Sequence, residues 1–173
     1  MTTSTPNATT IPMKNVNIVV IDYPGASKSA VYGLIETMDL ANEICLQIDA
    51  NVEFKTQVHN LENLLFDKAV DVVVLPPCVK DDFYTQENGV LDRYLSTMQQ
   101  QGATLASACV GAFILARGGF LDNKFSTTHW RLASLFTASF PKVKLDVNAI
   151  IVNEGNVITA GGRMAWLDLA FEI

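Results

Sequence analysis

The 173-residue sequence has few of the residues that build metal sites and disulfide frameworks. Its three cysteines, at positions 45, 78 and 109, form no C-x-x-C pair, and there are only two histidines. No zinc pattern can be assembled from so few ligands. An odd, sparse cysteine content is typical of a reducing compartment. We therefore expect no metal or other cofactor, and a cytoplasmic protein.

Positive charge and long apolar runs are also scarce. Twelve basic residues face 18 acidic ones, for a net charge of −6, and the basic residues are scattered singly. Clustered cations are needed to bind a phosphate backbone, so this chain alone is a poor candidate for binding nucleic acid. No apolar run is long enough to span a membrane, and the N-terminus lacks the regions of a signal peptide. We predict a disordered tail over residues 1–13 and one domain over 14–173.

Apolar runs typical of buried strands alternate with segments of helical periodicity. We expect strands at 16–21, 52–58, 71–75, 103–105, 148–153 and 156–159, and helices at 31–45, 61–69, 90–98, 110–116, 131–140 and after 162. Met164, Leu167 and Ala170 are expected on the apolar face of the last helix, and Cys45 on the core face of the first. The alternation predicts an α/β fold with a parallel sheet and helices on both faces, which binds ligands at the carboxyl ends of its strands.

The segment 106–111, Ala-Ser-Ala-Cys-Val-Gly, has the spacing of a nucleophile elbow with cysteine in place of serine. Its small residues permit a sharp turn from a strand into a helix. The turn would place the Cys109 thiol at the N-terminus of a helix, whose dipole favours thiolate. On this ground Cys109 is expected to be alkylated before Cys45. The alternative is a buried cysteine in a small-residue packing joint, and the spacing alone supports both equally.

Other segments that follow predicted strands are expected to line the same crevice. His129 is a candidate to face Cys109, although a cap at the start of the helix that carries Trp130 explains it better. Trp130 and Trp166 are expected in the core or an interface. The candidate ligand-binding residues are Cys78, Val110, Gly111, Gly161 and Gly162.

The order of these motifs resembles the ThiJ/PfpI superfamily. It is most similar to the class I glutamine-amidotransferase-like domains that form the N-terminal half of AraC-type transcription regulators. The resemblance rests on 107–116 (SACVGAFILA), 127–130 (TTHW) and 158–162 (ITAGG), and it is dense from 71 onward. It implies a flavodoxin-like α/β sandwich, usually dimeric, whose enzymes use the elbow cysteine beside an acidic side chain of the first helix.

The sequence departs from that pattern at two places that bear on catalysis. Ala30 stands where the enzymes often carry the acid, and Pro77, which has no N–H, stands where a glycine usually lines an oxyanion pocket. A cysteine without an acid or base partner does not meet the usual requirements of nucleophilic catalysis.

The leading hypothesis is a catalytically inactive, ligand-sensing and dimerisation domain of an AraC-family regulator. Its partners would be a small-molecule effector and a second copy, with DNA bound only through a C-terminal helix-turn-helix domain. The sequence stops within a helical pattern, so we expect it to be truncated before that domain. The alternative is a stand-alone ThiJ/PfpI-like hydratase or amidase that uses Cys109.

Overall fold

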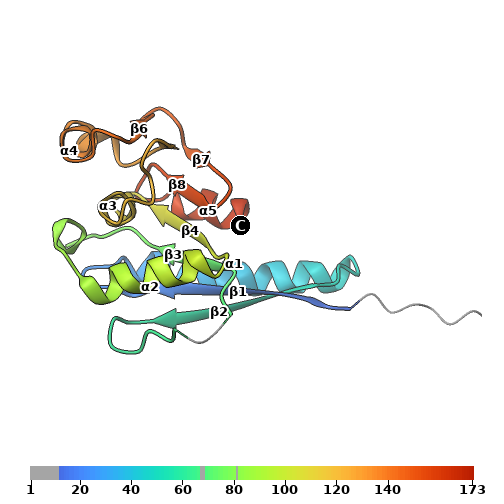
Figure 1. The fold of residues 1–173 in the computed structure, drawn as a ribbon. Coiled ribbons are helices and arrows are strands. Elements are labelled where there is room, and N and C mark those ends of the chain that lie inside the picture. The colour runs from blue at the N-terminus through green and yellow to red at the C-terminus, as the bar shows by residue number, and fades with distance from the viewer. Residues whose placement is uncertain (1–11, 67–68, 81) are drawn as a thin grey trace, which may run out of the picture.

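A mostly parallel, six-stranded sheet forms the centre of the molecule (Figure 1). The computed structural model describes residues 12–66, 69–80 and 82–173; most of the predicted tail, residues 1–11, lies outside them. The strand order is β2-β1-β3-β4-β8-β7, and only β7 runs antiparallel, paired with β8 across the turn at Glu154-Gly155. The strands are β1 (Lys14–Ile21), β2 (Val52–His59), β3 (Val72–Leu75), β4 (Thr104–Ala108), β7 (Ile151–Asn153) and β8 (Val157–Ala160).

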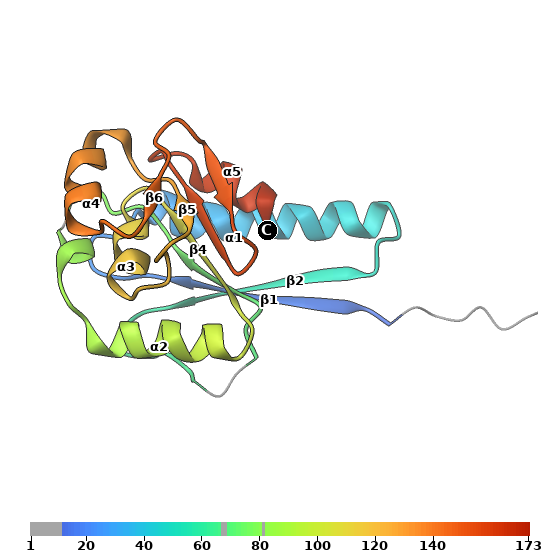
Figure 2. The same cartoon turned by 45° about the horizontal axis from the view of Figure 1, so that its top comes forward.

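Helices cover both faces of this sheet, as the sequence predicts. Helices α1 and α5 lie on one side and α2 on the other (Figure 2). The predicted apolar face of α2 is confirmed, because Leu91, Tyr94, Leu95 and Met98 are all buried. The helices are α1 (Lys28–Gln47), α2 (Gly89–Gln100), α3 (Gly111–Arg117), α4 (Ala133–Ser139) and α5 (Trp166–Glu172), with 3-10 turns η1 (Phe83–Thr85) and η2 (Trp130–Leu132) and a small second sheet of β5 (Phe125–Ser126) and β6 (Lys144–Leu145).

The helix predicted over 61–69 is wrong in its described part, where residues 61–66 form turns and irregular backbone. The Asn60 side chain accepts the amides of Glu62 and Asn63, and the Asn63 side chain accepts the amide of Asn60. Such local bonds offer the backbone an alternative to the helical ladder. The spacing of apolar residues alone does not reveal that these side-chain bonds compete with a helix.

The last helix begins later than predicted, and of the three residues expected on its apolar face only Ala170 is buried. Met164 precedes α5 and is 61% exposed, whereas Trp166, Leu169 and Ala170 are buried. The cause is a close approach to α1: a Cβ atom at Gly33 would lie 2.3 Å from the Trp166 ring. Trp166 is therefore a core residue, as expected, and it fixes α5 against α1.

Part of the α1 layer projects beyond the main body as an arm (Figure 1). All of β1 pairs with β2, but β3 reaches only the stretch 18–20, so 14–17 and 52–55 extend past the sheet. The Asn42 side chain ties the second half of α1 to this arm by accepting the Phe54 N–H and donating to the Phe54 carbonyl. Cys45 is only half-buried here, which corrects its expected place on a core face, because no further layer of the described residues covers the arm.

Candidate functional site

Cys109 occupies a sharp turn between the end of β4 and the start of α3. Its φ angle is 57°, in the left-handed region that non-glycine residues rarely adopt. The small residues around it have a steric reason: a Cβ atom at Gly111 would lie 2.6 Å from the Leu75 carbonyl oxygen. Gly111 is buried and does not line the cleft described below. This corrects its expected place among the ligand-lining residues.

Two of the sequence motifs meet to hold this turn. The Cys109 N–H donates to the carbonyl of Ala160 at the end of β8, at 2.8 Å. The Cys109 carbonyl accepts a hydrogen bond from the buried Thr128 hydroxyl, also at 2.8 Å. The Thr127 N–H in turn donates to the Thr159 hydroxyl. The Thr-Thr-His-Trp and Ile-Thr-Ala-Gly-Gly segments therefore act first as supports that fix the backbone of the cysteine.

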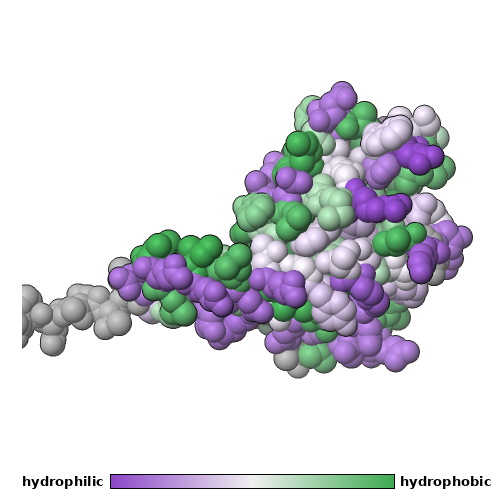
Figure 3. Space-filling model, turned by 180° about the vertical axis from the view of Figure 1, so that it is seen from behind, coloured by the Kyte–Doolittle hydropathy of each residue, from purple (hydrophilic) through white to green (hydrophobic). Residues whose placement is uncertain are grey.

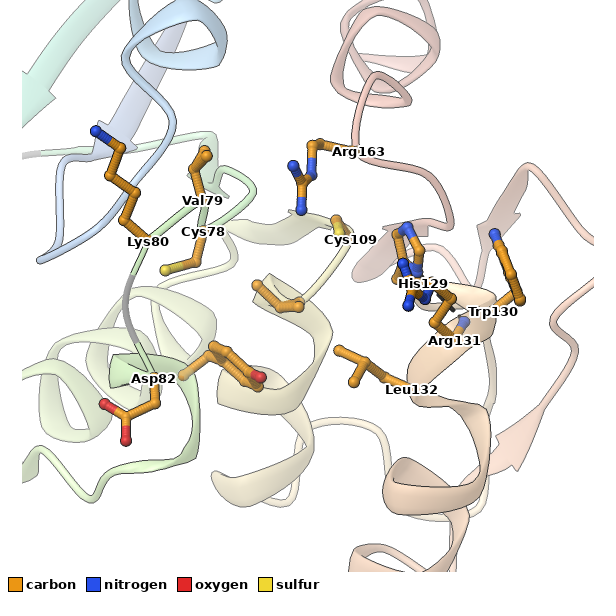
Figure 4. A pocket seen from close by; sticks show the side chains of 12 residues that line it. Cys78, Val79, Lys80, Asp82, Cys109, His129, Trp130, Arg131, Leu132 and Arg163 are labelled. Atoms are coloured by element: carbon orange, nitrogen blue, oxygen red, sulfur yellow. Dashed lines mark hydrogen bonds between the residues drawn. The ribbon is translucent and has the colours of Figure 1, made fainter.

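A cleft of about 1140 Å³ opens at the carboxyl ends of the strands (Figure 4). The structure brings four of the predicted site residues together there: Cys78, Cys109, Val110 and His129. The remaining lining residues are Val79, Lys80, Asp82, Tyr84, Trp130, Arg131, Leu132 and Arg163.

Gly161 and Gly162 do not share this cleft, which corrects the expectation of one common crevice. They line a separate cavity of about 320 Å³ bordered by Trp130. The reason is the packing of Gly161, where a Cβ atom would lie 2.9 Å from the Thr127 hydroxyl oxygen and 3.0 Å from the Ala149 carbonyl. Gly161 thus faces the neighbouring backbone instead of Cys109.

The Cys109 thiol is held in its neutral form, against the thiolate expected from the helix terminus. The residue is 2% exposed, and burial raises the pKa of its thiol, an effect only partly opposed by the Val110 amide and the Arg163 charge. Helix α3 has only seven residues. Desolvation of a charged sulfur therefore outweighs the favourable end of a short helix.

His129 both caps a helix and lines the cleft. Its Nδ1 atom accepts the Arg131 N–H at 3.3 Å at the start of η2, and its ring stacks on Trp130 with a centroid distance of 5.8 Å. Burial, followed by the positive charges of Arg163 and Arg131, lowers the pKa of His129. A neutral imidazole at physiological pH is the consequence.

Three cations that the sequence interpretation missed also line the cleft: Lys80, Arg131 and Arg163. In Figure 4 the Arg163 side chain reaches from the loop before α5 into the space between Cys78 and Cys109. These cations lie far apart in the sequence, so no cluster of basic residues predicts a cationic site. The one available signal was that Arg163 follows a predicted strand by a few residues, at the edge where ligands bind.

The described ranges 12–66, 69–80 and 82–173 contain neither a metal-binding cluster nor a membrane-spanning helix. Nowhere in them do three His, Cys, Asp or Glu side chains gather in a way that would hold a metal ion. Among the helices of these same ranges, none combines the length and the apolar character needed to cross a membrane.

The strand order, the helices on both faces and the cysteine at a strand-to-helix turn define a flavodoxin-like α/β domain. A family model gives the narrower assignment, since the DJ-1/PfpI family model matches residues 35–173. The chain therefore belongs to the DJ-1/PfpI family.

Curated relatives fall into two kinds. The chain is 29% identical over 83 residues to the HTH-type transcriptional regulator CdhR of Pseudomonas aeruginosa, covering 48% of this chain and 24% of the relative. It is 35% identical over 75 residues to the HTH-type transcriptional regulator GlxA of Rhizobium meliloti, covering 43% and 23%. It is also 27% identical over 104 residues to the isonitrile hydratase of Pseudomonas putida, covering 60% and 44%. The matched segment thus spans about a quarter of either regulator and less than half of the hydratase.

Solved structures support the fold. A putative transcriptional regulator protein from Vibrio parahaemolyticus superposes with a TM-score of 0.74 at 18% identity, covering 92% of both chains. Drosophila melanogaster DJ-1beta gives 0.73 at 19% identity, covering 91% of this chain and 88% of its own. An AraC family transcriptional regulator from Pseudomonas putida gives 0.68 at 16% identity, covering 92% and 89%. At these identities the likeness concerns the fold alone.

Proposed function

We propose that residues 14–173 form the ligand-sensing and dimerisation domain of an AraC-family transcription regulator that acts in the cytoplasm without catalysing a reaction. The observation that carries this proposal is the environment of Cys109. Its thiol is buried, and burial raises its pKa by more than the Val110 amide and the Arg163 guanidinium lower it. Curated relatives that share this domain are transcriptional regulators. DNA would be bound by a separate helix-turn-helix domain.

The cleft offers little to activate a nucleophile. Among the lining residues that the structure describes, Asp82 carries the only carboxylate, and Figure 4 shows it at the far side from Cys109, with its carboxylate directed away. Ala30, at the position where the family's enzymes often carry an acid, is fully buried and has no proton to give. The Nδ1 atom of His129 already accepts a hydrogen bond from the Arg131 N–H. General acid–base catalysis needs a group within hydrogen-bond reach of the reacting proton.

A stand-alone cysteine hydratase is the second candidate, and two observations favour it. The isonitrile hydratase match covers more of this chain than either regulator match does. The backbone of Cys109 also has the left-handed turn geometry of an elbow. This enzyme would have to ionise its thiol on binding substrate, because the free thiol has a raised pKa.

A screen for turnover separates the two candidates. Purified protein and its Cys109→Ser variant are assayed in parallel against isonitriles and simple amides. The sensor proposal predicts no rate that depends on the cysteine. Turnover that is lost in Cys109→Ser would establish the hydratase instead. Reading the coding frame past Ile173 gives a second, independent answer, because about a hundred further residues with two helix-turn-helix patterns would identify a regulator.

The dimerisation part of the proposal rests on the arm. Leu40 and Ile44 lie four residues apart on α1 and Ile48 follows as its C-cap, and the three are 55%, 47% and 67% exposed, forming one apolar stripe. In the view from behind, hydrophobic side chains gather along the projecting part of the molecule (Figure 3). A symmetric contact between two copies would remove this stripe from water, as closed homodimers do.

Sedimentation at tens of micromolar is expected to give a dimer, and Ile44→Glu to give a monomer. Leu135→Glu, at a similarly exposed position on α4, is the matched control and should leave the dimer intact. A monomeric wild-type chain would refute the proposed dimer. If the stripe instead belongs to the DNA-binding part of a longer protein, this chain alone will be monomeric and that part will bind it.

Specific DNA binding is not expected of this chain by itself, because its net charge is −6 and its basic residues are scattered singly along the sequence. Tight, sequence-selective binding in a mobility-shift titration at moderate salt would contradict this expectation.

A further inference from the structure

The Cys109 cleft carries a local charge opposite to that of the whole chain. The sequence has a net charge of −6, yet the described residues that line the cleft include Lys80, Arg131 and Arg163 against one carboxylate, that of Asp82. Cations confined in a low-dielectric cleft focus the field and raise the local concentration of anions. An excess of positive charge at this one place therefore favours a ligand of negative charge.

The two arginines of the cleft have no protein carboxylate to neutralise them among the described residues. The ion pairs found there join other residues: Lys28–Asp22, Lys55–Glu53, Arg117–Asp92 and Lys142–Asp122. The Arg131 guanidinium instead lies over the Trp130 ring, 5.9 Å from its centroid. As far as the described part of the chain goes, both guanidinium groups therefore keep donors for a bound anion.

The charges of the arginines converge on one place. Arg163 acts on the pKa of both Cys109 and His129, which belong to segments far apart in the sequence, and Arg131 acts on His129 as well. Figure 4 shows Arg163 over the gap between Cys78 and Cys109, with His129 and Arg131 together on the opposite wall from Lys80. An anion held by Arg163 would thus lie next to Cys109, between the two walls.

The remainder of the lining is largely apolar and aromatic. Val79, Tyr84, Val110 and Leu132 supply it. In Figure 4 the Leu132 side chain points toward the middle of the cleft from the side away from Arg163. Arg163 and Leu132 therefore face each other across the cleft, which matches a ligand with one anionic group and an apolar body.

We propose that the cleft binds a small organic carboxylate, with the carboxylate on the Arg163 guanidinium near Arg131 and the apolar part against Tyr84 and Leu132. This inference rests on the proposed sensor function and names the chemical class of its effector. The guanidinium presents parallel N–H donors in a fork that fits a planar carboxylate. A cationic ligand would meet three like charges at this site.

The test uses phenylacetate as the probe and phenylacetamide as its uncharged counterpart. Each is titrated into the isotope-labelled chain at low salt, and backbone amide shifts are followed. We expect phenylacetate to shift the amides of Cys109, His129 and Arg163, and phenylacetamide to bind about tenfold more weakly or worse. Inorganic phosphate, the third probe, has the charge without the apolar body and is expected to bind more weakly than phenylacetate.

Two variants with the same loss of charge complete the test. Arg163→Gln is expected to weaken phenylacetate binding about tenfold. Arg93→Gln, on the exposed face of α2 and outside the cleft, should leave it unchanged. A matching effect of both variants would show only a dependence on net charge and would overturn the inference.

The other outcomes are also decisive. Equal binding of the acid and the amide overturns the carboxylate inference but leaves the sensor proposal standing, since a small molecule still occupies the cleft. Phosphate binding as tightly as phenylacetate overturns the apolar part of the inference. Absence of any cleft shift at tens of millimolar probe overturns the inference as a whole. Cysteine-dependent turnover, by contrast, would overturn the sensor proposal and not the ligand class.

Discussion

Replacing Gly111 by alanine tests the geometry of the cysteine turn most directly. The new Cβ atom would lie 2.6 Å from the Leu75 carbonyl oxygen and 3.2 Å from the Cβ atoms of Leu75 and Ser107. The nearest of these atoms is backbone in a central strand, and the others lie close to it, so none can swing away as the end of a flexible side chain would. The strand β3 and the turn after β4 must then separate.

The expected cost follows from overpacking of a well-packed core, which is typically about 1–3 kcal/mol. The better helix propensity of alanine stabilises the folded state by up to about 1 kcal/mol and so offsets part of this cost. A net loss of about 2 kcal/mol is expected, which for a domain of this size lowers the melting temperature by about 4–8 °C. Gly89→Ala is the matched control, because Gly89 is likewise the first residue of a helix, but a Cβ atom added there would have no other atom within 4 Å.

Thermal and urea unfolding of both variants provide the measurement. Gly89→Ala should be neutral or up to about 1 kcal/mol more stable than the wild type. A Gly111→Ala protein within about 0.5 kcal/mol of the wild type would show that β3 does not press against the turn, and the steric explanation for glycine would be refuted.

Three further results are expected. Iodoacetamide at neutral pH should modify the half-buried Cys45 before Cys109, as followed by mass spectrometry, because Cys109 is 2% exposed and burial raises its pKa. Thr128→Val should cost about 1–2 kcal/mol in urea unfolding, because it removes the hydroxyl that donates to the buried Cys109 carbonyl. His129 should titrate below its usual pKa of 6.5 by NMR, and Arg163→Gln should raise that pKa.

The sign of the His129 effect on stability follows from linkage. Its pKa is lowered in the folded state, so the unfolded state binds the proton more tightly. The folded state therefore loses stability as the pH falls through the unfolded value of about 6.5.

His59→Gln assigns the imidazole signal, and Thr137→Val, at an exposed position on α4, is the control for Thr128→Val. Faster labelling of Cys109, a harmless Thr128→Val or a His129 pKa above 6.5 would each contradict the electrostatics and packing described.

The fold was predictable from sequence where one physical effect dominates. Buried strands such as 72–75 are continuous apolar runs, and α2 shows a clear helical stripe, so both were predicted correctly. The segment 61–66 failed because side-chain bonds of Asn60 and Asn63 compete with a helix, and hydrophobic periodicity contains no such contribution.

The site was predictable only as far as the topology reaches. Cys78, Cys109 and His129 follow strands or link to them, and the sheet edge brings them together. The state of the thiol was not predictable, because desolvation depends on how completely the walls of the cleft close over Cys109. The role of Arg163 was not predictable for a related reason. A single arginine in the sequence indicates no binding site, and the site forms only because distant segments place Arg131 and Lys80 in the same cleft.

The position of Arg163 connects the cleft to the proposed dimer surface. Arg163 lies three residues before Trp166, whose ring packs against Gly33 of α1, and the second half of α1 carries the exposed apolar stripe. A ligand that draws Arg163 toward Cys109 therefore acts on the segment that sets α5 against α1. Linkage makes this coupling reciprocal, so any change in dimer affinity must equal the change in ligand affinity. Phenylacetate affinity is expected to differ between protein concentrations well below and well above the dimer dissociation constant, and identical affinities would show that the cleft and α1 are uncoupled.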